Sequence, residues 1–118
     1  MKKLFILLLI ACSFGASAQT KAQETAHIKL PTIQCDMCKN RIETYVKRYD
    51  GISSIVVNVK NKEAVVKYLT DRINIEDIKA AIATAGFDAD DVTAEPDAYK
   101  RLPTCCKKPE DGGGMKKN

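Results

Sequence analysis

The sequence predicts an α+β domain with the element order β-α-β-β-α-β, in which two helices cover one face of an antiparallel sheet. Two observations lead to this prediction. The spacing of apolar residues switches between the period of a strand and the period of a helix along residues 26–94. The length of 118 residues leaves room for one domain of this size. We therefore expect a four-stranded sheet that carries both helices on the same side.

The first strand and the first helix are predicted within residues 27–50. Polar and apolar residues alternate over residues 27–30, as in a half-buried strand, and Pro31 marks its end. After Cys35 the apolar residues recur at helical spacing. The buried stripe of this helix is expected to contain Cys38, Ile42, Tyr45, Val46 and Tyr49. The pair Asp50-Gly51 is expected to end it.

Two strands, a second helix and a last strand follow. Residues 55–60 alternate in polarity, and Asn61-Lys62 suit a turn. The return strand is expected to bury Ala64, Val66 and Tyr68. Asn74 is predicted as the N-cap of a helix, with Gly86 at its C′ position. The buried stripe of that helix is expected to contain Ile75, Ile78, Ile82 and Ala85. A short strand is expected over residues 91–94.

Both ends of the chain are expected to lie outside this domain. Residues 1–18 have the pattern of a signal peptide, with a basic start, an apolar run and an Ala-x-Ala cleavage site, and residues 19–25 are expected to be a linker. This predicts a periplasmic or secreted protein. In the alternative, residues 9–12 form a lipoprotein motif and Cys12 carries a lipid anchor. Residues 95–118 are rich in proline and glycine and are expected to form a flexible tail.

Composition excludes several function classes. The formal net charge of +4 falls toward neutrality when Lys2 and Lys3 leave with the signal peptide. A nearly neutral chain without tryptophan does not support nucleic-acid binding. The sequence offers no plausible acid–base pair, no Ser-His arrangement and no phosphate-binding glycine loop. We therefore expect neither an enzyme nor a protein with a small-molecule substrate.

Two pairs of cysteines carry the chemistry of the sequence. Cys35 and Cys38 form a C-x-x-C motif at the corner between the first strand and the first helix, and Cys105 and Cys106 are adjacent in the tail. A helix N-terminus favours thiolates, and sulfur ligands select soft ions such as Cu(I). His27 is the only histidine and is expected to be an exposed strand residue. The sequence therefore predicts a soft-metal site at Cys35 and Cys38.

Other interpretations of the first pair stay open. A disulfide between Cys35 and Cys38 is possible in an oxidising compartment, although it would close a very short loop and stabilise the fold little. A thiol–disulfide redox protein is a second alternative. The residue directly before Cys35 is Gln34 and not an aromatic one, however, and the predicted order of elements is not that of thioredoxin.

For the second pair, the sequence leaves four roles open. Cys105 or Cys106 could supply an additional metal ligand, form a vicinal disulfide, pair between chains or belong to a passive tail. The last strand is expected to run away from the C-x-x-C corner, so the tail would begin at the far end of the domain. Residues 95–104 could return across it, since they extend by about 30 Å.

Two segments of the chain resemble one known family. Thr32-Ile33-Gln34-Cys35-Asp36-Met37-Cys38 precedes an amphipathic helix, and Ala85-Gly86-Phe87-Asp88-Ala89 follows the second helix. Together they resemble the heavy-metal-associated domain, over about residues 26–94. The resemblance implies a ferredoxin-like fold that binds one metal ion through Cys35 and Cys38. It also implies transfer of that ion by thiolate exchange to a metal-transporting membrane protein or another metal-binding domain.

The resemblance also indicates the surroundings of the site and the ion. Phe87 matches an aromatic or basic position that packs beside the metal, and it can at the same time be a core residue that caps the second helix. Met37, between the two cysteines, is expected next to the site. Gln34 stands where zinc- and lead-binding members often have an acidic residue, which favours Cu(I); Hg(II) and Zn(II) are the alternatives. A periplasmic mercury-binding protein is accordingly the alternative carrier.

Overall fold

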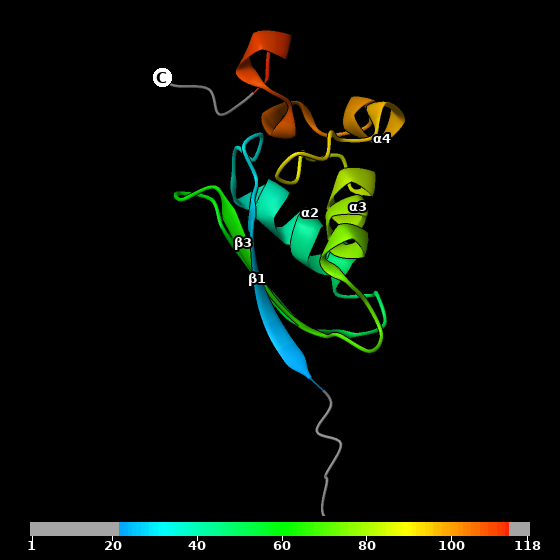
Figure 1. Cartoon of the computed structure of the whole chain (residues 1–118). Coiled ribbons are helices and arrows are strands. Elements are labelled where there is room, and N and C mark those ends of the chain that lie inside the picture. Colours follow the sequence, from blue (N-terminus) through cyan, green and yellow to red (C-terminus); the bar gives the residue numbers. More distant parts are fainter. Residues whose placement is uncertain (1–21, 114–118) are drawn as a thin grey trace, which may run out of the picture.

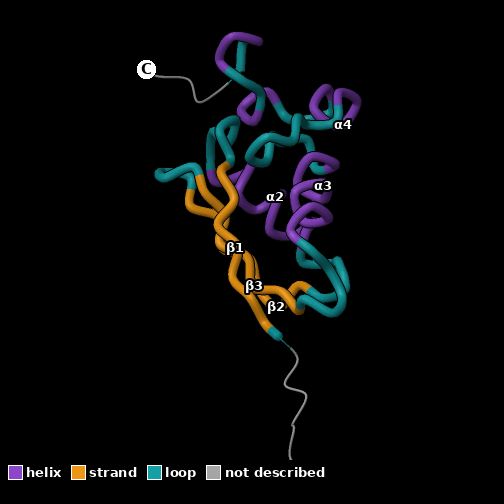
Figure 2. The backbone as a smooth tube through the Cα atoms, in the orientation of Figure 1, coloured by secondary structure: helices purple, strands orange, loops and turns teal. Residues whose placement is uncertain are grey.

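The computed structural model describes residues 22–113 and contains a three-stranded antiparallel sheet with two main helices. Both helices lie on the same face of the sheet (Figures 1 and 2). The elements are, in chain order, β1 (Gln23–Lys29), α2 (Asp36–Val46), β2 (Ile52–Asn58), β3 (Glu63–Leu69) and α3 (Ile75–Thr84). This is the predicted α+β arrangement up to the end of the second helix.

The sheet has the order β1-β3-β2, and its pairing explains which side chains are buried. Val66 of β3 lies opposite Ala26 of β1 and Ile55 of β2. The buried residues of β3 are Ala64, Val66 and Tyr68, as their alternation with polar residues predicts. β1 begins earlier than expected, because Gln23 already pairs with Leu69. Residues 23–25 are therefore part of the sheet and not of a linker.

The two helices bury the predicted faces except at Tyr45, which is only partly buried, and at Tyr49 and Ile75. In α2 the buried residues are Cys38, Ile42 and Val46, and the helix ends before Tyr49, which is 36% exposed. In α3 the buried residues are Ile78, Ala81, Ile82 and Ala83, while Ile75 in its first turn is exposed. The predicted N-cap is confirmed, since Asn74 Oδ1 accepts a hydrogen bond of 2.8 Å from the amide of Asp77.

The predicted fourth strand at residues 91–94 is absent from the described chain. Residues 89–92 form a tight turn with a single bridge between Ala89 and Val92, and only Asp90 bonds to β1, through Lys29. The Asp88 carboxylate accepts the amide of Ala94 at 2.8 Å. Aspartate carboxylates thus accept hydrogen bonds from backbone amides that would otherwise be free to pair in a sheet. Such side-chain-to-backbone bonds compete with sheet formation.

The segment expected to be a flexible tail is folded over residues 96–111. It contains α4 (Pro96–Lys100) and two short turns of 3₁₀ helix, η1 (Thr104–Cys106) and η2 (Pro109–Asp111). Ala98 and Leu102 are buried, and the amide of Glu95 donates to the carbonyl of Ala83 at 2.9 Å. Without a fourth strand to carry it away, the chain after α3 remains at the end of the domain where β1 meets α2 (Figure 1).

Several predictions concern residues outside the described part. The predicted signal peptide at residues 1–18, the lipidation alternative at Cys12 and the start of the predicted linker all lie there. Within residues 22–113, no helix is both long enough and apolar enough to cross a membrane.

Candidate metal centre

The C-x-x-C motif lies at the corner between β1 and α2, and the loop that carries it is anchored on both sides. Ile33 is fully buried, and the Thr32 hydroxyl accepts the amide of Asp88 at 3.1 Å. Cys35 is the N-cap of α2 and has an extended backbone, which places Cys38 in the first helical turn. The two sulfur atoms are 3.1 Å apart. The corner thus holds both sulfurs at the positive end of the helix dipole.

The second cysteine pair lies at the same place. Leu102 is buried, and Pro103 leads directly into η1, where the amide of Cys106 donates to the Pro103 carbonyl at 2.8 Å. This turn packs against α2. The tail therefore reaches the C-x-x-C corner directly from α4, and the predicted return across the whole domain is not needed.

The described cysteines form one group, which we call the four-cysteine cluster: Cys35, Cys38, Cys105 and Cys106. A disulfide joins Cys38 to Cys106, and Cys35 and Cys105 are free thiols. The Cys35 sulfur lies 3.6 Å from the Cys105 sulfur, and the Cys105 and Cys106 sulfurs are 4.0 Å apart. The structure thus connects one cysteine of each sequence pair, and neither the disulfide within the C-x-x-C motif nor the vicinal one is formed.

The cluster is largely removed from water. Cys38 and Cys106 are fully buried and Cys35 is 7% exposed, whereas Cys105 is partly accessible. A hydrogen bond to Cys35 and partial burial raise the pKa of the Cys105 thiol above its ordinary value. Met37 is 56% exposed, and its Sδ lies 3.7 Å from the Cys105 sulfur. The sulfur contact of Met37 is thus with a cysteine of the tail.

The other residues singled out from the sequence lie in the core or on the surface. Phe87 is fully buried and belongs to the same hydrophobic cluster as Cys35 and Cys38. His27 is exposed on β1 and pairs with Glu63, in agreement with the prediction of an exposed strand residue.

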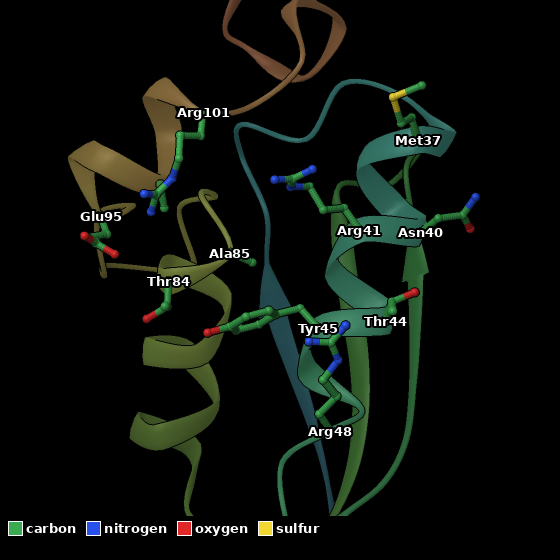
Figure 3. Close-up of a pocket in the computed structure, with 11 residues that line it drawn as sticks. Met37, Asn40, Arg41, Thr44, Tyr45, Arg48, Thr84, Ala85, Glu95 and Arg101 are labelled. Atoms are coloured by element: carbon green, nitrogen blue, oxygen red, sulfur yellow. The ribbon is translucent and has the colours of Figure 1, made fainter.

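A groove of about 620 Å³ borders the cluster at Met37 and lies between α2, the end of α3 and α4 (Figure 3). Arg41 from α2 and Arg101 from the end of α4 both extend toward it, and Arg48 lines its lower part (Figure 3). The groove presents polar and basic groups and none of the four sulfurs. It is a feature beside the cluster and not the candidate metal site.

The donor set of the cluster indicates the ions that it could hold. Cys35, Cys105 and Cys106 have sulfurs within 4.8 Å of one another, the only group of three or more His, Cys, Asp or Glu ligands within residues 22–113 that could hold an ion. Sulfur donors bind soft ions such as Cu(I) and also Zn(II), whereas Mg(II) and Ca(II) prefer oxygen. The sequence left a metal-ligand role for Cys105 or Cys106 as one of four alternatives, because the two pairs are far apart along the chain. The pairing of cysteines cannot be deduced from their spacing alone.

The family model of the heavy-metal-associated domain matches residues 27–88, which is more than half of the chain. The copper chaperone CopZ of Staphylococcus epidermidis is 31% identical over 61 residues, which cover 52% of this chain and 90% of that protein. A copper-exporting P-type ATPase of the same species is 29% identical over 73 residues, which cover 62% of this chain but only 9% of the ATPase.

A solved structure of a CopZ metallochaperone superimposes with a TM-score of 0.54 at 26% identity, and the match covers 56% of this chain and 98% of that one. The region that the family model matches contains the C-x-x-C motif and ends at residue 88, before the tail.

Proposed function

Since this chain belongs to the heavy-metal-associated domain family, we propose that it is a Cu(I) carrier that binds the ion through Cys35 and Cys38 and passes it to a partner protein. The observation that carries the proposal is the position of the two sulfurs, 3.1 Å apart at the first turn of α2. Similarity to a copper chaperone over 90% of that chaperone's length supports copper as the ion.

The chain's own residues favour a soft monovalent ion. Each donor in the cluster is sulfur, and the two proposed ligands lie in an apolar environment with Cys38 fully buried. A hard ion would lose its water ligands there without gaining oxygen donors, whereas Cu(I) bonds well to thiolates. The dipole of α2 adds positive potential at its N-terminus, which stabilises the thiolates that Cu(I) requires.

Binding by this pair requires reduction of the Cys38–Cys106 disulfide. Two electrons and two protons from an external dithiol, itself oxidised to a disulfide, convert the bond into two thiols. Cu(I) then displaces one proton from each ligating thiol. In the transfer step, thiolates of the acceptor bind the ion before Cys35 and Cys38 release it.

The acceptor that we propose is a metal-transporting membrane protein or another domain of this family. This is supported by the similarity to a segment of a copper-exporting P-type ATPase. We also propose that residues 1–18 export the chain to the periplasm or the exterior, on the evidence of their sequence pattern alone.

The family is one of metal-binding modules, and the matched relative is named as a chaperone and not as an enzyme. The chain is accordingly a metal-handling protein without an enzymatic reaction of its own.

The first prediction tests the two proposed ligands. The full chain is reduced under anaerobic conditions, freed of reductant and titrated with Cu(I) against a chromogenic Cu(I) chelator. We expect wild type to bind one Cu(I) per chain in competition with the chelator. Cys35→Ser/Cys38→Ser should lose at least about 100-fold in affinity, because it removes both proposed thiolate ligands and leaves only the two sulfurs of the tail. Val56→Ala, at an exposed position of β2, is the control and should bind like wild type.

Equal affinity of wild type and the double variant would contradict the proposal. Preference for Hg(II) or Zn(II) over Cu(I) in the same competition would identify a different carrier. A reduced protein that binds none of the three ions but exchanges disulfides rapidly with a dithiol would support the redox alternative.

A further inference from the structure

The tail cysteines are held by a folded segment and not by a loose terminus. The Tyr99 hydroxyl donates to the Asp111 carboxylate and accepts the amide of Lys108 at 2.8 Å, so α4 and η2 are joined across the turn that bears the cysteines. The ammonium of Lys108 also lies 5.4 Å from the centre of the Tyr99 ring. Because contacts on both sides fix η1, the positions of Cys105 and Cys106 at the corner are part of the fold.

The sulfur of Cys35 lies close to the sulfurs of two other cysteines, one from the motif and one from the tail. This sulfur lies 3.1 Å from Cys38 and 3.6 Å from Cys105, and Cys105 lies 4.0 Å from Cys106. Three sulfurs around one ion at a metal–sulfur distance of about 2.3 Å are about 4.0 Å apart. The set formed by Cys35, Cys105 and Cys106, all within 4.8 Å of one another, is close to this size. Only small shifts would be needed to place one ion among three sulfurs.

We infer that the tail is part of the metal site. In the reduced protein, Cys105 and Cys106, the latter released from its disulfide, bind the ion together with Cys35. Cys38, whose sulfur lies 3.1 Å from that of Cys35, is the further ligand from the C-x-x-C motif. The inference rests on the proposed function and adds the number and origin of the ligands. The site of this chain would then be closed by its own sulfurs, with at least three of them on the ion.

A closed site changes how the ion leaves. Thiolates of an acceptor must reach the ion where η1 now lies, since η1 packs against α2 at the corner. Transfer therefore requires that η1 moves away first. Met37, exposed and 3.7 Å from the Cys105 sulfur, offers a thioether at the accessible edge of the cluster, where an acceptor would approach.

The second prediction tests the tail ligands with Cu(I) as the probe. Wild type and Cys105→Ser/Cys106→Ser, both full-length, reduced and loaded with one Cu(I), are compared by X-ray absorption. We expect three or more sulfurs on copper in wild type and two in the variant. We also expect the variant to release Cu(I) to a chelator at least about tenfold faster. Thr104→Ala, an exposed residue of the same turn, is the matched control and should behave as wild type.

Cys105→Ser alone provides a second measurement, since this partly exposed side chain can be replaced with little effect on folding, which circular dichroism would verify. It should release Cu(I) faster than wild type but more slowly than the double variant, because one tail sulfur remains. Two sulfurs and equal release rates in wild type and both tail variants would overturn the inference and leave the Cys35/Cys38 carrier intact. Failure of wild type to bind Cu(I) would instead overturn the proposed function, and the inference with it.

Discussion

Phe87 is the residue that links the hydrophobic core to the loop before the cluster. Its side chain is fully buried, and the amide of the next residue, Asp88, donates to the Thr32 hydroxyl in the loop that leads to Cys35. A change in the packing of Phe87 would therefore shift the loop before Cys35 through the hydrogen bond between the Asp88 amide and the Thr32 hydroxyl. The resemblance implies a position beside the metal and also allows a core role; the structure shows Phe87 fully buried in the core.

The third prediction concerns this residue. Phe87→Ala removes a large side chain from a closed core and should lower the free energy of unfolding by about 3–5 kcal/mol. The control is Val56→Ala, at a position that is 58% exposed, for which we expect a loss below about 1 kcal/mol. Urea unfolding of both variants measures the difference. Similar losses in the two variants would show that Phe87 does not support the core.

At the scale of elements, the junction between α3 and α4 fixes the tail. Gly86 follows α3 with φ +106°, a left-handed conformation that favours glycine. A Cβ atom at this position would lie 3.0 Å from Cδ2 of Leu102 and 3.1 Å from the carbonyl oxygen of Ala98. The close approach of α4 to the end of α3 therefore depends on a residue without a side chain.

The fourth prediction uses this junction. Gly86→Ala should loosen α4 and η1, because it adds both backbone strain and two close contacts, and trypsin should cut after Lys100 and Arg101 faster. Gly112→Ala is a matched control, since Gly112 also has a positive φ of +81° but no atom within 4 Å of the added Cβ. Equal cleavage rates in the two variants would show that the contacts with Leu102 and Ala98 do not hold the tail.

The elements that could be predicted from the sequence are those whose pattern is local. The alternation around Val66 identified the buried face of β3, and the Asn74 side chain identified the start of α3. The segment after α3 could not be predicted correctly. Whether it forms a strand or a turn depends on which backbone amides donate hydrogen bonds to individual aspartate carboxylates. The carboxylates of Asp88 and Asp90 accept hydrogen bonds from the amides of Ala94 and Lys29, respectively. The spacing of polar and apolar residues does not predict these bonds.

The cluster shows the same limit at the level of the site. The C-x-x-C spacing and the start of a helix identified Cys35 and Cys38 as neighbours, and their sulfurs are 3.1 Å apart. The disulfide between Cys38 and Cys106 spans a separation of 68 residues and was not singled out. This disulfide can form because residues 91–94 do not form a strand, so the tail stays at the corner. That is a feature of the tertiary structure, which the cysteine spacing does not predict.

At the scale of the whole molecule, this disulfide joins two segments that are 68 residues apart in the chain. It connects the first turn of α2 to η1 and so encloses β2, β3, α3 and α4 in one covalent loop. Crosslinks over long loops reduce the entropy of the unfolded chain, by about 4 kcal/mol for a loop of this length in the chain-entropy model. The reduced form that we propose for metal binding is therefore the less stable one until an ion joins the same elements.

The fifth prediction follows from this difference between the two redox forms. The oxidised, metal-free chain should unfold at a higher urea concentration than the same chain in the presence of a dithiol, with a difference in free energy of up to about 4 kcal/mol. Cys106→Ser cannot form the bond and should unfold at the same urea concentration with and without dithiol. Cu(I) added to reduced wild type should restore stability, because an ion held by cysteines of α2 and η1 again connects the two elements and stabilises only the folded state. A wild-type midpoint that is the same in both redox forms would show that the crosslink between α2 and η1 does not stabilise the fold.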